Sequence, residues 1–220
     1  MINNWSKLFE YNYSKDIIDI NKYCDAIFYI NLSRRTDRLQ SIQKECAKYN
    51  IRATHFNAVD GNLLNYKIDN SISSGQIGCL SSHIEIIKIC KDNRYNKVMI
   101  LEDDVIFKNN IKYISHYVNR LPVSWDMFYL TGNNLFGLRP INNLIYKTHG
   151  TLSTAAYMIR SSIFDQILDI ANNTIEHPID TYYAKMHQYI NAYVAVPSLA
   201  YQMAGFSDIE NTYVNYDFMK

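Results

Sequence analysis

The stretch Lys97-Val98-Met99-Ile100-Leu101-Glu102-Asp103-Asp104 places an apolar run directly before three acids. A short, continuous apolar run of this kind is typical of a strand that is buried on both faces of a sheet. A second such run covers residues 26–30 and leads into Asn31. The two runs predict a central sheet that is covered by helices on both sides.

Strand and helix patterns alternate along the rest of the chain. Apolar residues recur at helical spacing in residues 34–49, where Ser33 or Thr36 could cap the helix, and in residues 76–92. Further strands are expected at 53–59, 126–130, 155–159 and 192–196, and further helices at 111–121, 161–171 and 180–190. Strands separated by helices predict an α/β fold with a mostly parallel, Rossmann-like sheet.

Length and composition are those of an ordinary globular domain. The chain has 220 residues, of which 48% are hydrophobic and 20% charged, and its formal net charge is +1. We expect one domain over residues 25–220, preceded by an N-terminal extension over residues 1–24. Binding a run of phosphates needs a clustered basic surface. The largest basic cluster, Arg34, Arg35 and Arg38, is too small for this, so nucleic acid is not an expected partner.

The sequence predicts neither a membrane span nor an export signal. It has no stretch of 18 apolar residues, which a transmembrane helix would need. Its first 25 residues lack the apolar core of a signal peptide. The cysteines Cys24, Cys46, Cys79 and Cys90 form no C-x-x-C pair, which favours buried, reduced thiols. A cytoplasmic location is therefore predicted, with peripheral membrane association left open.

The three acids are the sharpest chemical signal, because ligands of open α/β sheets gather at the carboxyl ends of strands. Polar residues also follow two other strands, at 31–38 and 131–133. Strand alternation would point Glu102 and Asp104 to one side and Asp103 to the other. Close carboxylates repel one another, so a positive charge should compensate them, and oxygen ligands suit Mg²⁺ or Mn²⁺. The alternative is a solvated acidic turn.

Several common catalytic and phosphate-binding motifs are absent from the sequence. It has no G-x-G-x-x-G and no G-x-x-x-x-G-K-[ST], which disfavours a dinucleotide oxidoreductase and a P-loop enzyme. It has no G-x-S-x-G, so the common hydrolase elbow is missing. The six histidines include no H-E-x-x-H pair, so the sequence gives little support to a zinc site.

An ordered set of segments resembles the motifs of one family. The set comprises Tyr29-Ile30-Asn31-Leu32-Ser33-Arg34-Arg35-Thr36-Asp37-Arg38, Phe56-Asn57-Ala58-Val59-Asp60-Gly61, Gly78-Cys79-Leu80-Ser81-Ser82-His83, Leu101-Glu102-Asp103-Asp104, the strand at 150–159 and Pro178-Ile179-Asp180. In this order the segments resemble glycosyltransferase family 25, which includes lipooligosaccharide and procollagen galactosyltransferases. One departure is Leu152-Ser153-Thr154, where shorter residues are usual, and it leaves the acceptor side of the site open.

The resemblance implies a single domain of the GT-A type. Such a domain binds a UDP-sugar together with a divalent metal, usually Mn²⁺, and passes the sugar to an acceptor hydroxyl with inversion. A metal on strand-end carboxylates would neutralise the charge that develops on the leaving diphosphate. Asp104 is the expected direct metal ligand. Glu102, the second candidate ligand, or Asp103 would assist the metal or hydrogen-bond the ribose.

Further residues are expected around the donor. Asn31 would contact the uracil, and the other candidates for the nucleotide, the diphosphate or the sugar are Arg34, Arg38, Asp60, Gly61, Ser82 and His83. Each has a structural alternative: a strand-end turn, a solvated basic face, or a buried histidine that only packs and hydrogen-bonds. Cys79 is expected to be a small packing residue.

Inversion needs a general base near the acceptor hydroxyl. Asp180 is the best candidate, and its alternative role is to cap the helix that follows it. Asp126 is the other candidate, with a structural role at the start of its strand as the favoured interpretation. Ser207 and Asp208, in a segment that resembles the tail of the family, are candidates for closing over the donor.

The expected reaction moves a hexose, galactose or glucose, from a UDP-sugar to a hydroxyl group. The acceptor would be a glycan, a lipid-linked saccharide such as lipooligosaccharide, or a hydroxylated protein. The alternative is a catalytically inactive sugar- or nucleotide-sugar-binding module of the adhesion type on the same fold. The intact acid triplet argues against this alternative, because an inactive copy has no need to keep mutually repelling carboxylates.

Overall fold

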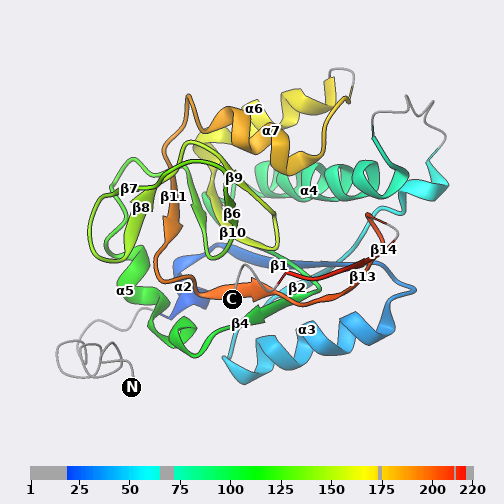
Figure 1. Cartoon of the computed structure of the whole chain (residues 1–220), viewed down its shortest axis with the longest axis horizontal. Coiled ribbons are helices and arrows are strands. Elements are labelled where there is room, and N and C mark those ends of the chain that lie inside the picture. The colour runs from blue at the N-terminus through cyan, green and yellow to red at the C-terminus, as the bar shows by residue number, and fades with distance from the viewer. Residues whose placement is uncertain (1–18, 65–71, 173–174, 211, 217–220) are drawn as a thin grey trace.

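A computed structural model describes residues 19–64, 72–172, 175–210 and 212–216 of the chain (Figure 1). Within these residues the central element is an eight-stranded sheet. In spatial order its strands are β2 (Thr54–Asn57), β1 (Ala26–Asn31), β3 (Lys97–Glu102), β10 (Ala156–Arg160), β5 (Met127–Tyr129), β11 (Ala192–Ala195), β8 (Ile145–Lys147) and β7 (Arg139–Pro140). Every strand expected from the sequence is in this sheet.

The sheet is mostly parallel, as the sequence predicts. β2, β1, β3, β5, β11 and β7 run in one direction, and β10 and β8 run in the other. β10 begins beside the end of β3, where Ala156 pairs with Leu101. The chain arrives there from β9 (Thr151–Leu152), which pairs with β6 (Asn133–Asn134) shortly after the end of β5. It therefore enters the sheet from the carboxyl edge, and β10 runs antiparallel to its neighbours.

Helices cover both faces of the sheet, which confirms the predicted α/β class. One face carries α3 (Thr36–Lys48), and the other carries α4 (Ser74–Asp92), α6 (Phe164–Leu168) and α7 (Ile179–Met186) (Figure 1). Alternate residues of β3 divide between two cores: Met99 and Leu101 pack on the α3 side, and Val98 and Ile100 pack on the α4 side. Burial on both faces explains why this strand is apolar throughout.

Shorter elements complete the described chain. They are α2 (Ile20–Tyr23), β4 (Val105–Phe107), α5 (Ile114–Val118), β12 (Ala200–Gln202), β13 (Gly205–Ser207), β14 (Thr212–Val214) and the 3-10 turns η1 (Gly61–Leu63), η2 (Asn109–Tyr113), η3 (Ser161–Ile163) and η4 (Asp169–Asn172). β12 pairs with β4, and β13 pairs with β14. None of the helices in the described part combines the length and the apolar character that a bilayer span requires.

The predicted N-terminal extension is only partly described. Residues 1–18 of it lie outside the described residues. Ile20 and Cys24, which also fall in it, are buried in the core on the α3 side of the sheet. The described end of the extension is thus continuous with the domain.

The two long helices begin differently. α4 begins with a capping box, in which Ser73 Oγ accepts from the Gln76 amide at 3.1 Å and Gln76 Oε1 accepts from the Ser73 amide at 2.9 Å. The predicted capping of α3 by Ser33 or Thr36 is wrong. Arg35 occupies the N-cap of α3, and the Ser33 hydroxyl instead donates to a side chain at the end of β2.

Three of the expected helices are clearly shorter than predicted, since the one expected at 180–190 ends at Met186. The segment at 111–121 contains only part of η2 and the short helix α5, and the segment at 161–171 contains η3, α6 and part of η4. The residues of α5, Ile-Ser-His-Tyr-Val, are all weak helix formers and are all buried. Packing against the core, rather than intrinsic propensity, therefore holds this turn.

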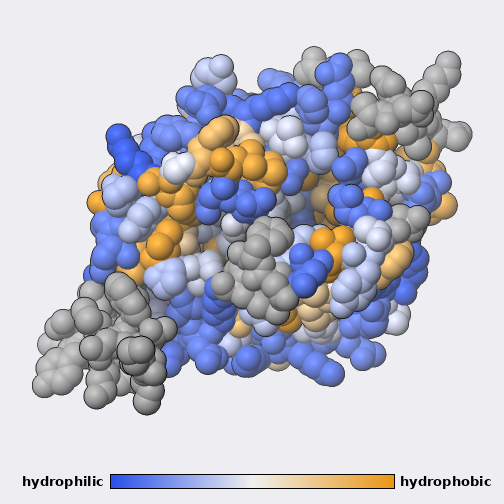
Figure 2. All heavy atoms as spheres, viewed as in Figure 1, coloured by the Kyte–Doolittle hydropathy of each residue, from blue (hydrophilic) through white to orange (hydrophobic). Residues whose placement is uncertain are grey.

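The surface of the described residues is apolar near the β7–β8 edge of the sheet. Leu135, Phe136 and Ile141 are exposed there. Figure 2 shows hydrophobic residues gathered over the part of the view where Figure 1 places β7, β8 and β11. This area follows β6 in the chain.

A close backbone contact joins η1 to the start of α4. A Cβ atom on Gly61 would lie 1.7 Å from the Ser74 carbonyl oxygen, and one on Gly78 would lie 2.5 Å from the Val59 carbonyl oxygen. Only glycine at these two positions permits the contact, and neither has a positive φ. The contact fixes the loop after β2 against the first turns of α4.

We expect Gly61→Ala to lower the free energy of unfolding by about 1–3 kcal/mol, since the new methyl group forces backbone apart. Gly137→Ala is the matched control, because no described atom lies within 4 Å of its added Cβ. The control should stay within about 0.5 kcal/mol of the parent. Urea denaturation of both variants measures the difference, and equal stability of the two would contradict the packing argument.

Candidate active site

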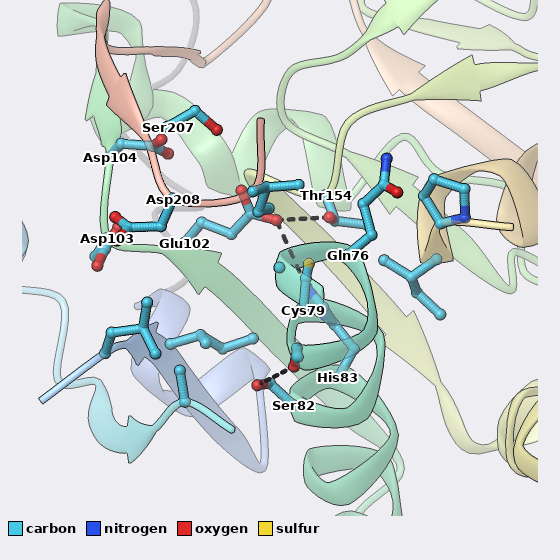
Figure 3. Close-up of a pocket in the computed structure, with 18 of the residues that line it drawn as sticks. Gln76, Cys79, Ser82, His83, Glu102, Asp103, Asp104, Thr154, Ser207 and Asp208 are labelled. Atoms are coloured by element: carbon cyan, nitrogen blue, oxygen red, sulfur yellow. Dashed lines mark hydrogen bonds and ion pairs between the residues drawn. The ribbon is translucent and has the colours of Figure 1, made fainter. Parts of the chain in front are cut away.

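A cavity of about 340 Å³ opens at the carboxyl ends of β1 and β3 (Figure 3). This is the edge at which open α/β sheets bind ligands. Of the predicted site residues, those that line it are Asn31, Arg34, Arg38, Asp60, Ser82, His83, Glu102, Asp103, Asp104, Asp180, Ser207 and Asp208. Asn133, from the third polar strand end, lines it too. Gly61, which was also predicted, is not among the described residues that line the cavity. Its role is the close backbone contact with the start of α4.

Arg38 of α3 holds two of the three acids. Its Nη1 donates to Asp103 Oδ1 at 3.0 Å and to Asp104 Oδ2 at 3.1 Å. Asn31 Nδ2 donates to Asp103 at 2.7 Å, and Gln202 Nε2 donates to Asp104 at 3.2 Å. The positive charge expected beside the acids is therefore supplied, in part, by the protein itself.

The predicted alternation of the three acids is wrong. β3 ends at Glu102, and residues 103–104 form a turn, so Asp103 and Asp104 both reach Arg38. Glu102 points elsewhere: it accepts from Thr154 Oγ1 at 2.6 Å. Figure 3 shows Asp103 and Asp104 on one side of the cavity and Glu102 turned toward Thr154.

Asp104 is not fully satisfied by these contacts. Its Oδ1 atom is buried and has no hydrogen-bond partner among the described residues. Burial, followed by the negative charge of Glu102, raises the pKa of Asp104 well above the ordinary value. A buried carboxylate oxygen without a donor fits a cation ligand, because a hard cation would satisfy both the lone pairs and the charge.

Glu102 stays ionised more easily than Asp104. Burial on its own would raise the pKa of Glu102, but the neighbouring His83 ring and the Thr154 hydroxyl outweigh burial, and the pKa is lowered. His83 Nε2 lies 3.5 Å from Glu102 Oε1. The two sides of the cavity therefore differ in charge and in partners.

Three arginines tie the tail of the described chain to the cavity. Arg34 pairs with Asp60 and also with Asp208 at 2.9 Å, and Arg35 pairs with Asp208 as well. Arg38 Nη2 donates to the Phe206 carbonyl oxygen at 2.7 Å. The solvated basic face considered for these residues is therefore wrong for Arg35 and Arg38, which are largely buried, whereas Arg34 pairs with two acids and is still 46% exposed. Their contacts hold β13 and Asp208 beside the cavity.

Ser82 and His83 lie on α4 and are fully buried. Ser82 Oγ donates to the Gly78 carbonyl at 2.7 Å and accepts from the Val59 amide at 2.9 Å, so the hydroxyl fixes the loop after β2. His83 Nδ1 is bonded to the Tyr157 hydroxyl at 2.8 Å. The ring edge that carries Nε2 faces Glu102.

Asp180 lies on the far side of the cavity, in the first turn of α7. The alternative prediction that it caps this helix is wrong, because Pro178 is the N-cap. Asp180 Oδ2 instead accepts from the Ser153 amide at 3.1 Å. Ser153 has a φ of 78°, in the left-handed region, which costs free energy for a residue other than glycine. The backbone at Ser153 thus orients a carboxylate on the cavity wall.

Sequence reasoning did not single out Gln202 or Thr154 as site residues. Gln202 reaches Asp104 because β12 pairs with β4, the strand that directly follows the acids. No local sequence pattern predicts the pairing of β12 with β4. Thr154 lies in the segment at 150–159, directly before the expected strand. Because β10 begins beside the end of β3, a residue just before β10 lies near the acids, and this position was the signal that could have identified Thr154.

Sequence comparison places this geometry in a known family. Residues 24–135, just over half of the chain, match the model of glycosyltransferase family 25, described as an LPS biosynthesis protein. The chain belongs to glycosyltransferase family 25. The strand end at Asn31, the glycine contact with α4 and the three acids all lie in the matched part.

Relatives in family 25 differ in what their names say about activity. The chain is 26% identical over 219 aligned residues to procollagen galactosyltransferase 1 of Danio rerio. This alignment covers 80% of this chain and 36% of that protein. It is 28% identical over 127 residues to the human protein named inactive glycosyltransferase 25 family member 3, covering 48% of this chain and 21% of that protein. The chain therefore spans about a third or less of these curated relatives.

A solved structure supports the fold. A glycosyltransferase involved in the glycosylation of the major capsid of PBCV-1 superposes with a TM-score of 0.51 at 12% identity. The superposition covers 84% of this chain and 95% of that chain. At this identity the likeness concerns the fold alone.

We expect Arg38→Met to lower the free energy of unfolding by about 3–5 kcal/mol, because it leaves Asp103 and Asp104 buried without a charge partner. Adding Asp103→Asn and Asp104→Asn to this variant should recover much of the loss. Arg52→Met is the control, since the Arg52 side chain is 69% exposed and lies 3.8 Å from Asp19. Urea denaturation in chelator-containing buffer measures the free energy of unfolding of each variant. If Arg38→Met loses no more of this free energy than Arg52→Met does, the role of Arg38 is refuted.

Proposed function

We propose that the chain is an active, metal-dependent glycosyltransferase that moves a hexose, galactose or glucose, from a UDP-sugar to a hydroxyl group with inversion. The observation that carries the proposal is the buried Asp104 carboxylate, with an oxygen that no described donor satisfies, inside the cavity of a family 25 domain. Such a carboxylate costs folding free energy, and a cation bound with the donor would offset that cost.

The residues around Asp104 fit a hard divalent ion, Mn²⁺ or Mg²⁺. The carboxylate oxygens of Asp103 and Asp104 line the cavity there, and carboxylate oxygens are ligands that these ions prefer. Glu102, the second ligand expected from the sequence, contacts Thr154 and His83 instead, so the proposed ion is centred on Asp104. When bound, the ion would act as a Lewis acid on the diphosphate.

The nucleotide would lie between the strand end at Asn31 and the loop at Asp60. Asn31 Oδ1 is buried and has no hydrogen-bond partner in the described part of the chain, so it can accept from a uracil N–H. The Arg34 side chain is 46% exposed, and its guanidinium already binds two carboxylates. The oxygens of a diphosphate could bind the same guanidinium, because they resemble carboxylate oxygens in charge and geometry. Ser207 and Asp208, held beside the cavity by arginines, would cover the donor from the other side.

Asp180 is the proposed general base. Its carboxylate would take the proton of the acceptor hydroxyl while the acceptor oxygen forms a bond to the anomeric carbon. The bond from that carbon to the diphosphate oxygen breaks, and UDP leaves with the electron pair. The Ser153 amide would keep the carboxylate in position during this step.

The acceptor would approach from the side of Asp180 and Asn133. The exposed Leu135 and Phe136 follow Asn133 in the chain and offer apolar and aromatic surface for a sugar ring. A glycan, a lipid-linked saccharide or a hydroxylated protein would each present the required hydroxyl. The competing function is a sugar-binding module without turnover, which the name of the inactive human relative brings into consideration.

UDP release from a panel of UDP-sugars, with Mn²⁺ and then with chelator, is the first test. We expect one UDP-hexose to be hydrolysed slowly without acceptor, and Asp104→Asn to lower this rate by about 100-fold or more. Asp92→Asn, an exposed acid at the far end of α4, is the matched control and should keep the parent rate. Full activity of Asp104→Asn in chelator would refute the metal role, and donor binding without any release would favour the inactive module.

Asp180→Asn tests the base separately. We expect UDP release to fall by about 10²–10⁴-fold, because the amide cannot accept the proton. Asparagine keeps an oxygen for the Ser153 amide, so donor affinity measured by calorimetry should not change. Parent-like turnover, or a loss of donor affinity that accounts for the whole effect, would remove Asp180 from the role of base.

A further inference from the structure

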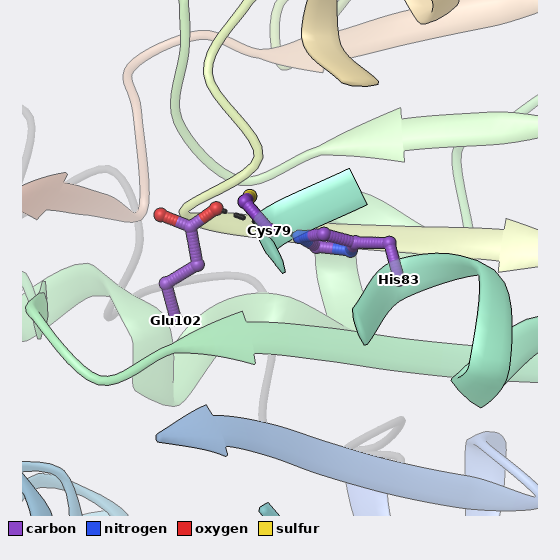
Figure 4. Close-up of side chains that lie close together, drawn as sticks. All are labelled: Cys79, His83 and Glu102. Atoms are coloured by element: carbon purple, nitrogen blue, oxygen red, sulfur yellow. Dashed lines mark ion pairs between the residues drawn. The ribbon is translucent and has the colours of Figure 1, made fainter. Parts of the chain in front are cut away.

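A second group of metal-ligating side chains lies in the cavity, apart from Asp104. Cys79, His83 and Glu102 place one ligand atom each so that all three lie within 4.8 Å of one another (Figure 4). Cys79 and His83 are four residues apart on α4 and therefore share a face of the helix, and Glu102 comes from the end of β3. Among the residues that the structure describes, this is the one group of three His, Cys, Asp or Glu side chains whose ligand atoms lie this close together.

The His83 ring is held as a metal-ligating histidine usually is. Its Nδ1 is bonded to the Tyr157 hydroxyl at 2.8 Å, and that hydroxyl lies 3.2 Å from the Tyr183 hydroxyl. A ligand histidine generally uses its other ring nitrogen in such a bond, which fixes the ring orientation. Nε2 is then the free edge, and it faces Cys79 and Glu102.

His83 Nε2 has no hydrogen-bond partner among the described residues, although the side chain is fully buried. Leaving a buried polar nitrogen unsatisfied costs about 1–3 kcal/mol. Glu102 Oε1, at 3.5 Å, is too far for a good hydrogen bond. However, two ligand atoms of one tetrahedral zinc ion lie roughly 3.5 Å apart, and the distance between His83 Nε2 and Glu102 Oε1 matches that separation.

We propose that Cys79 Sγ, His83 Nε2 and Glu102 form a Zn²⁺ site that is distinct from the hard-metal position at Asp104. Sulfur, imidazole and one carboxylate are a donor set that favours zinc over Mn²⁺ or Mg²⁺. All three residues line the cavity, so the fourth position opens onto it, as in zinc sites that keep a place for water or for an oxygen of a ligand.

Cys79 is the ligand that must adjust most. His83 Nε2 and Glu102 Oε1 are already 3.5 Å apart, so any longer separation in the group, up to 4.8 Å, involves Cys79 Sγ and has to shorten by about 1 Å. Burial, together with the negative charge of Glu102, raises the pKa of the Cys79 thiol. Binding therefore releases the thiol proton, and the apparent affinity should rise with pH.

The inference does not depend on the sugar donor, and its test has a readout other than activity. Metal-free protein is titrated with Co²⁺, which takes tetrahedral zinc sites and reports a thiolate ligand by a charge-transfer band in the near ultraviolet. We expect the charge-transfer band and intense visible bands to saturate at one Co²⁺ per chain, and these bands to be lost when Zn²⁺ is added.

Variants decide which residues hold the ion. Cys79→Ser should abolish the charge-transfer band, and His83→Gln should weaken Co²⁺ binding by about 10-fold or more. Cys90→Ala, on the same helix but outside the group, should keep the band. Circular dichroism and thermal melting check that each variant is folded.

Asp104→Asn separates this inference from the proposed function. It should keep the Co²⁺ spectrum even as it lowers UDP release. The inference is overturned if the parent protein shows no thiolate band, if Cys79→Ser retains it, if Cys90→Ala loses it, or if Asp104→Asn removes it. Failure of every UDP-sugar in the release assay would leave the Co²⁺ result unaffected.

Discussion

The site depends on the Arg38 guanidinium, which lies between Asp103 and Asp104. Two buried carboxylates next to each other would be strongly destabilising without it, because the hydrogen bonds from Asn31 and Gln202 are neutral and neither acid would have a charge partner. Arg38 comes from α3, the acids from the end of β3, and the Phe206 carbonyl that Arg38 also binds comes from β13. One cation thus joins three separate parts of the chain. It does not neutralise them fully, because two carboxylates face one guanidinium, and Asp104 Oδ1 is left as the point at which a further cation fits.

The end of β3 divides the cavity into two chemical environments. Glu102 is the last strand residue and points toward α4, whereas the turn after it carries Asp103 and Asp104 toward α3. The α3 side offers oxygen donors and charge. The α4 side offers sulfur, imidazole and one carboxylate. Carboxylates adjacent in sequence can therefore serve metals of different character, since donor type selects the ion more than proximity does.

Much of this could be predicted from the sequence, and the failures have a common cause. Buried strands such as 97–101 identify themselves by apolar runs, and the strand-end acids follow directly from that. The alternation of the acids failed because a turn begins at Asp103, and alternation holds only within a strand. Gln202 and the partners of Arg38 were missed because they arise from pairing between segments far apart in the chain. The Cys79 group was missed for the same reason: its third ligand comes from a strand and not from a neighbouring position on the helix.

The question of an active or inactive domain turns on what the unsatisfied atoms are for. A binding module could recognise a sugar with neutral hydrogen-bonding groups and would gain stability by replacing Asp104 with an apolar or amide side chain. This chain instead keeps a carboxylate whose burial raises its pKa, beside a second acid and with one oxygen unpartnered in the described structure. It also keeps Asp180 oriented by a backbone amide from a residue in a costly conformation. Backbone strain and an unpartnered carboxylate oxygen in one cavity are expected of a domain that binds a metal and moves a proton. They therefore favour the proposed active transferase over a module that only holds a sugar.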